Sequence, residues 1–136
     1  MQLEEMTLKA LIVDDSALMR KLVDRALRQS GVELSEVLEA STGLEALNEV
    51  RSAKNAGKAF DLILSDINMP VMDGLTFLEE MRKEDLSTNV PIVMITTEGT
   101  EQYVLRAIAN GARGYICKPF TAEQVKARIL PLLKAA

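Results

Sequence analysis

Short apolar runs alternate with longer stretches of helical periodicity along the chain. Each run is the length of a β-strand, and each is followed by apolar residues spaced three or four positions apart, as in an α-helix. The pattern therefore predicts five strands, each followed by a helix. The strands are predicted at residues 8–13, 37–40, 60–64, 92–95 and 114–117. Within the last helix, Pro131 predicts a bend or an end near Leu130, because proline cannot donate the helical hydrogen bond.

Strands that alternate with helices are typical of an α/β fold, in which helices cover both faces of a parallel sheet. The runs at 60–64 and 92–95 are apolar at nearly every position, as expected of central strands that are buried on both faces. The length of 136 residues is that of one domain. We therefore expect a single α/β domain with a five-stranded parallel sheet.

The composition excludes several kinds of site. The sequence contains no histidine and one cysteine, which excludes Ser-His-Asp and Cys-His catalysis, His-ligated zinc and an internal disulfide. The net charge of −4 argues against a nucleic-acid partner. No apolar run is long enough to cross a membrane, so we expect a cytoplasmic protein without a membrane partner. A functional site must therefore be built from carboxylates, hydroxyls, lysine, arginine and backbone groups.

Polar residues follow four of the five predicted strands. The carboxyl ends of parallel strands meet at one edge of the sheet, where sites of α/β proteins form. We therefore expect these side chains to lie close together. They are Asp14, Asp15 and Ser16 after the first strand, Ser65, Asp66 and Asn68 after the third, Thr96, Thr97 and Glu98 after the fourth, and Lys118 after the fifth.

Three of these residues are acids, and their convergence would be unfavourable without a cation. An all-oxygen cluster of Asp14, Asp15 and Asp66 suits a hard cation, and Mg²⁺ is the natural choice because it needs few protein ligands. The simpler alternative is that Asp14 or Asp15 only caps the first helix. A cap does not account for Asp66 or for Lys118 at two other strand ends.

Four segments in this order carry a resemblance to a known family. Residues 13–16, 65–74, 96–98 and 114–120 resemble the conserved segments of response-regulator receiver domains, in particular those of single-domain chemotaxis regulators. The resemblance covers the chain from about residue 8 to the last helix. It implies a flavodoxin-like (βα)5 fold with strand order 2-1-3-4-5. It also implies one receiver domain over residues 1–136, with a short N-terminal extension at about 1–7 and no output domain.

The resemblance assigns roles to the acids and the lysine. Asp66 is implied to be the phosphoacceptor. The phosphoryl group is implied to come from a histidine kinase or a histidine phosphotransfer protein. Mg²⁺ is implied to bind Asp15, Asp66 and the backbone carbonyl of Asn68, with Asp14 acting through water. Lys118 is implied to pair with a phosphoryl oxygen. The implied chemistry is limited to self-catalysed phosphoryl transfer to Asp66 and slow autodephosphorylation, so we do not expect an enzyme.

The resemblance also implies a conformational switch. Thr96 is implied to move toward the phosphoryl group, and Tyr115 to swing inward after it, which remodels the face of the fourth helix, fifth strand and fifth helix. A monomer would then signal by contact between this face and an output protein that the sequence does not identify. Asn68 and Glu98 match positions that tune loss of the phosphoryl group. A cis peptide bond is implied before Pro119.

Two further features have simpler interpretations. Cys117 is predicted to be a small buried apolar residue of the fifth strand. The basic residues of the first helix predict a solvated face, with a docking surface for an acidic kinase or phosphotransfer partner as the alternative. These basic residues are Arg20, Lys21, Arg25 and Arg28.

Other functions remain open on the sequence. Among receivers, a chemotaxis regulator is the first hypothesis and a phosphate-shuttling or developmental regulator the second. A phosphatase with an aspartate nucleophile would need a second aspartate at the position of Asn68. A flavin carrier would not place Asp14 and Asp15 where it binds a phosphate. A degenerate receiver that acts only by interaction would not need the intact set of acids and lysine.

Overall fold

Strands and helices alternate along residues 8–97 and 99–134, which are the residues described by the computed structural model. The expected extension at residues 1–7 lies outside these residues. None of the helices in the described ranges is long and apolar enough to span a membrane. The elements are β1 (Leu8–Val13), α1 (Ala17–Gln29), β2 (Leu34–Ala40), α2 (Gly43–Asn55), β3 (Leu62–Ser65), α3 (Gly74–Lys83), β4 (Ile92–Thr96), α4 (Glu101–Ala109), β5 (Gly114–Cys117) and α5 (Ala122–Lys134).

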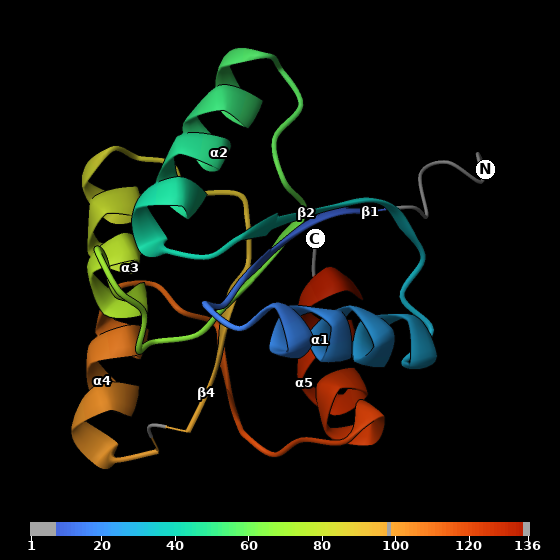
Figure 1. Cartoon of the computed structure of the whole chain (residues 1–136). Helices are drawn as coiled ribbons and strands as arrows, with labels where there is room; N and C mark the ends of the chain where they lie inside the picture. Colours follow the sequence, from blue (N-terminus) through green and yellow to red (C-terminus); the bar gives the residue numbers. More distant parts are fainter. Residues whose placement is uncertain (1–7, 98, 135–136) are drawn as a thin grey trace.

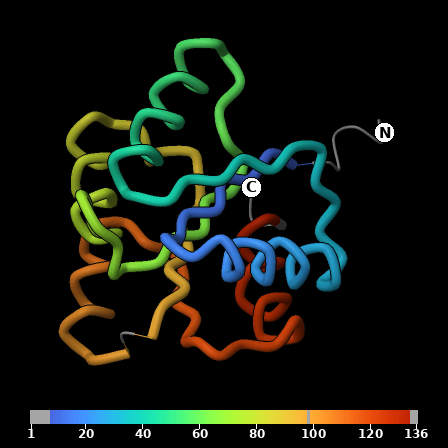
Figure 2. The backbone as a smooth tube through the Cα atoms, viewed as in Figure 1, coloured from blue at the N-terminus to red at the C-terminus, as the bar shows by residue number. Residues whose placement is uncertain are grey.

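The five strands form one parallel sheet in the order β2-β1-β3-β4-β5, which confirms the predicted fold. Helices α1 and α5 contact each other on one face of the sheet, whereas α2, α3 and α4 pack in sequence on the other (Figure 1). The backbone trace shows the same division (Figure 2). Every strand points the same way, so the loops that follow the strands gather at one edge of the sheet.

The sheet separates two hydrophobic cores. Successive residues of a strand point to opposite faces, and β1 shows this clearly. Leu11 and Val13 join the core beneath α2 and α3, where Phe77 is among the largest fully buried side chains. Ala10 and Ile12 join the core beneath α1 and α5. Because β1, β3 and β4 are buried on both faces, they hold the site loops on a rigid base.

The edge strands differ from their predictions. Strand β2 begins at Leu34, three residues earlier than predicted. The prediction missed this start because Ser35 and Glu36 are exposed polar residues that interrupt the apolar pattern of the strand. Cys117 is exposed at the end of β5, so the prediction that it is buried was wrong. Ile116 points into the core at this open edge, and the next side chain therefore faces outward.

The C-terminal helix continues through its proline. A bend or an end was predicted near Leu130; helix α5 runs to Lys134, so it does not end there, and the bend stays a prediction. Leu132 and Leu133 pack against the core beneath α1 and α5, and this packing holds the last turn despite Pro131. Tertiary burial here outweighs the local cost of a proline within a helix.

Candidate functional site

Three carboxylates converge at the carboxyl edge of the sheet. Asp14 and Asp15 follow β1, and Asp66 follows the neighbouring strand β3. One oxygen of each lies within 4.8 Å of the others. Asp14 and Asp66 are buried, at 3% and 8% exposed, whereas Asp15 is open to solvent. The sequence therefore predicted correctly that these acids meet, and the cluster has one accessible side.

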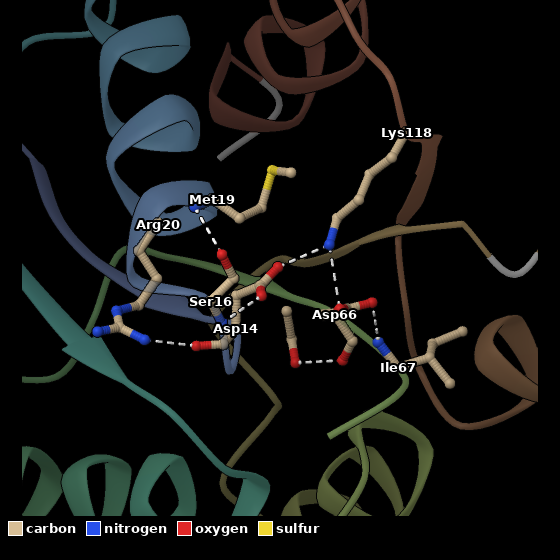
Figure 3. Close-up of polar contacts among 8 residues, drawn as sticks. Asp14, Ser16, Met19, Arg20, Asp66, Ile67 and Lys118 are labelled. Carbon is tan, nitrogen blue, oxygen red and sulfur yellow. Dashed lines mark hydrogen bonds and ion pairs between the residues drawn. The ribbon is translucent and has the colours of Figure 1, made fainter. Parts of the chain in front are cut away.

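Lys118 reaches this cluster from the end of β5. Its Nζ donates to Oδ2 of Asp14 at 2.7 Å and to Oδ2 of Asp66 at 3.0 Å (Figure 3). Burial lowers the pKa of the ammonium, but the hydrogen bonds and charges of the two aspartates outweigh burial and raise that pKa above its ordinary value. Lys118 is therefore charged at neutral pH, and one cation faces three acids. The peptide bond from Lys118 to Pro119 is cis, as predicted.

Backbone amides fix the other oxygens of the two buried acids. The Ser16 amide donates to Oδ1 of Asp14 at 2.9 Å, and the Ile67 amide donates to Oδ1 of Asp66 at 2.7 Å (Figure 3). Helix α1 is capped by Ser16, whose hydroxyl accepts from the Met19 amide at 3.2 Å. The side chain that caps α1 is therefore that of Ser16 and not that of Asp14 or Asp15.

Gly74 allows α3 to begin directly against the backbone of Asp66. A Cβ at Gly74 would lie 2.0 Å from the carbonyl oxygen of Asp66, which no side chain can tolerate. The Gly74 amide also donates to the Ile67 carbonyl at 2.8 Å, and Asp73 caps the helix by accepting from the Thr76 amide at 2.7 Å. Sequence reasoning missed this close approach, because a contact with a backbone atom leaves no residue pattern.

Three of the four residues predicted to switch or to tune the site lie within the described part of the chain. Thr96 is fully buried at the end of β4, and its carbonyl accepts from the Lys118 amide at 2.9 Å. Tyr115 is half-buried in β5 and packs against the core beneath α2 and α3. Asn68 is exposed in the loop after β3. Glu98 lies outside the described residues.

Arg20 lies beside the site, although the sequence predicted a solvated helix face, with a partner-docking surface as the alternative. Its Nη1 donates to the backbone carbonyl of Asp14 at 2.7 Å (Figure 3), and its Nε donates to Oε1 of Glu39 at 2.5 Å. The side chain is only 17% exposed. A contact to a backbone carbonyl leaves no residue pattern, so the sequence carries no signal for it.

Comparisons with known proteins identify the family of this chain. Residues 10–130 match the family described as the response regulator receiver domain. The chain belongs to this family. It is 37% identical over 122 residues to chemotaxis protein CheY1 of Helicobacter pylori, covering 90% of the receiver chain and 94% of CheY1. It is 35% identical over 126 residues to the CheY homologue of Campylobacter jejuni, covering 93% of this chain and 92% of the homologue.

Solved structures of receivers share the fold. Chemotaxis response regulator CheY4 of Vibrio cholerae is 38% identical, with a TM-score of 0.71 over 95% of this receiver and 98% of that chain. A chain of the CheX–CheY–BeF3–Mg²⁺ complex of Borrelia burgdorferi is 31% identical, with a TM-score of 0.78 over 92% and 88%. The oxygen-only cluster of this receiver fits a hard cation such as Mg²⁺.

Proposed function

We propose that this receiver accepts a phosphoryl group on Asp66 from a phosphohistidine of another protein, in a reaction that requires Mg²⁺. The observation that carries the proposal is the environment of the Asp66 carboxylate. It contacts the Lys118 ammonium at 3.0 Å and lies in a cluster with Asp14 and Asp15. A nucleophile, a cation and ligands for a metal are therefore gathered at one accessible point.

The proposed step makes one bond and breaks another. An oxygen of Asp66 attacks the phosphorus, an acyl phosphate forms, and the phosphorus–nitrogen bond breaks. The bonding electrons leave with the imidazole of the donor, which takes up a proton. The donor must be another protein, because this sequence contains no histidine. Lys118 then pairs with a phosphoryl oxygen, since its charge already lies between Asp14 and Asp66.

The metal ligands are those that the resemblance to receiver domains implies, and they lie on the accessible side of the cluster. Asp15, Asp66 and the backbone carbonyl of Asn68 would hold Mg²⁺, with Asp14 contributing through water. The bound ion would offset the charge between the carboxylate nucleophile and the incoming phosphoryl oxygens. Asp15 and Asn68 are exposed, so this side of the cluster is open to a hydrated ion.

Output is proposed to pass through Thr96 and Tyr115 to the face formed by α4, β5 and α5. Leu105 and Ile108 of α4 are 57% and 56% exposed there, which supports a protein partner. The similarity to CheY proteins favours an output partner in chemotaxis over a phosphate-shuttling or developmental role. The chemistry proposed for the chain itself is limited to phosphoryl transfer to Asp66 and slow hydrolysis of the product. We expect a monomer.

Tyrosine emission can test the switch, because the sequence has two tyrosines and no tryptophan. In Tyr103→Phe the remaining emission comes from Tyr115. Beryllofluoride with Mg²⁺, which mimics the phosphoryl group, should change this emission, and Asp66→Asn in the same background should abolish the change. An emission that does not respond in Tyr103→Phe, while the beryllofluoride complex forms, contradicts the proposed switch.

The phosphoacceptor can be tested with a small donor. Acetyl phosphate and Mg²⁺ should add the mass of one phosphoryl group, as measured by intact-protein mass spectrometry, and Asp66→Asn should prevent it. Asp61→Asn is the matched control, because Asp61 precedes β3 at its other end and accepts from the Lys9 amide at 2.9 Å. An adduct that persists in Asp66→Asn, or no adduct in the unchanged protein, refutes the mechanism.

The output partner requires a separate measurement. The protein carrying beryllofluoride and the unmodified protein are compared as baits for binding proteins from the source cell. A chemotaxis component retained only by the activated form supports the first hypothesis. A histidine phosphotransfer protein that receives the phosphoryl group back from Asp66 supports the shuttling role instead.

A further inference from the structure

Arg20 joins three elements next to the acid cluster. It lies in the first turn of α1, and its guanidinium contacts the carbonyl of Asp14, the residue after β1, and the carboxylate of Glu39 in β2. The two distances are 2.7 Å to the Asp14 carbonyl oxygen and 2.5 Å to Oε1 of Glu39. The side chain is largely buried, whereas Glu39 is 46% exposed. The guanidinium is therefore directed toward the backbone of the site.

The carbonyl that Arg20 holds belongs to the peptide between Asp14 and Asp15. The orientation of this peptide determines how the two side chains diverge. The Asp14 side chain turns inward to Lys118, and Asp15 remains exposed at the accessible side of the cluster. The Asp14 amide is also fixed, because it donates to the Ala40 carbonyl at 3.0 Å. With Arg20 in place, both sides of Asp14 are hydrogen-bonded to neighbouring elements.

We propose that Arg20 is a positioning residue for the metal site, and that Glu39 holds it in place. Its hydrogen bond to the Asp14 carbonyl sets the direction of the Asp15 carboxylate and thereby strengthens Mg²⁺ binding. This inference rests on the proposed function, because it concerns the metal that supports phosphorylation of Asp66. Groups that orient metal ligands by hydrogen bonds, without contacting the metal themselves, contribute about tenfold or more to metal affinity.

Charge and position predict opposite effects for the loss of Arg20. A positive guanidinium close to a cation site repels the cation, so its removal alone should strengthen Mg²⁺ binding. Loss of the hydrogen bond frees the peptide between Asp14 and Asp15, so its removal should weaken Mg²⁺ binding. The ion pair with Glu39 offsets the guanidinium charge, which favours the positional effect. The direction of the change in Mg²⁺ affinity therefore shows whether the lost charge or the lost hydrogen bond has the larger effect.

The test is a titration of the whole chain with Mg²⁺ alone. Binding is monitored through the amide signals in nuclear magnetic resonance spectra. We expect Arg20→Met to raise the dissociation constant for Mg²⁺ about tenfold. Arg20→Lys should recover part of the affinity, because an ammonium can reach one acceptor but not bridge two. Arg25→Met is the matched control: it removes the same charge from an exposed position of α1 and should leave the affinity unchanged.

A second signal does not depend on the metal. The Asp15 amide belongs to the peptide whose carbonyl accepts from Arg20. In the metal-free protein, the chemical shift of this amide should therefore change in Arg20→Met and stay the same in Arg25→Met. If Arg20→Met does not fold, as judged by circular dichroism, Arg20→Lys and Glu39→Gln take its place, and both should bind Mg²⁺ more weakly. An unchanged or stronger affinity in the folded Arg20 variants overturns the inference. Failure of acetyl phosphate to modify Asp66 in the unchanged protein refutes the proposed function instead.

Discussion

Replacement of Gly74 by alanine tests how tightly the start of α3 is packed against the backbone of Asp66. The added Cβ would lie 2.0 Å from the carbonyl oxygen of Asp66, 2.9 Å from its carbonyl carbon and 3.0 Å from the Cα of Ile67. All three atoms belong to the backbone, so no flexible side chain can rotate away. Ordinary contact begins at 3.4 Å, so the start of α3 and Asp66 must separate by about 1.4 Å.

The cost of this separation can be set against the better helix propensity of alanine. Overpacking of a rigid site costs about 1–3 kcal/mol, and a backbone clash belongs at the upper end. Alanine favours a helix over glycine by about 1 kcal/mol at most. The expected net loss is therefore about 2 kcal/mol in the free energy of unfolding. For a domain of this size, the melting temperature should fall by about 6 °C.

Thermal and urea unfolding measure this loss, and Gly99→Ala is the matched control. A Cβ at Gly99 would approach the Cys117 sulfur at 3.4 Å, which is an ordinary contact. Acetyl phosphate should also modify Asp66 more slowly in Gly74→Ala, because the backbone of the acceptor has moved. A melting temperature of Gly74→Ala equal to that of the unchanged protein would refute the reasoning from close approach.

Three further substitutions test other parts of the fold. Val71 has a φ of 69° and is 79% exposed, in a γ-turn closed by the hydrogen bond from the Met72 amide to the Pro70 carbonyl. Val71→Asn should therefore raise the free energy of unfolding by about 1 kcal/mol, and a decrease in urea titrations would contradict this. Phe77→Ala should lower it by about 3–5 kcal/mol, because the ring is fully buried; a loss below about 1 kcal/mol would argue against a tightly packed core. The hydrogen bonds from Arg51 hold the pKa of Glu84 below its ordinary value of 4.5, so the stability gained from the pair is complete above pH 4.5 and lost as the pH falls. In Arg51→Met, a carboxyl titration by nuclear magnetic resonance should show that pKa rising toward its ordinary value, and an unchanged midpoint would show that the pair does not form in solution.

The sequence was sufficient to locate the central strands, although β3 begins at Leu62 rather than at residue 60, and to predict the convergence of the acids. Strands β3 and β4 are buried on both faces, so their apolar runs stand out in the sequence. Asp14, Asp15 and Asp66 could be placed together because the ends of parallel strands share an edge. The geometry of the fold, once inferred, therefore locates the site without any knowledge of side-chain contacts.

The remainder could not be predicted, for physical reasons that differ by position. At the edge strands, the apolar pattern weakens because one side meets solvent, and both the start of β2 and the exposure of Cys117 were mispredicted. Arg20 and Gly74 act on backbone atoms of Asp14 and Asp66. Backbone atoms are the same in every residue, so such contacts carry no signature in the sequence.

The separation of the two cores by the sheet has a consequence for how substitutions combine. Leu27 packs beneath α1 and α5, and Phe77 packs beneath α2 and α3, so the two side chains share no hydrophobic cluster. Effects on stability from the two layers should therefore add, with little coupling energy. The exception is the carboxyl edge, where Asp14 leads into α1 and Asp66 leads into α3. An event at this edge reaches both layers at once, and each layer can be altered elsewhere without disturbing the other.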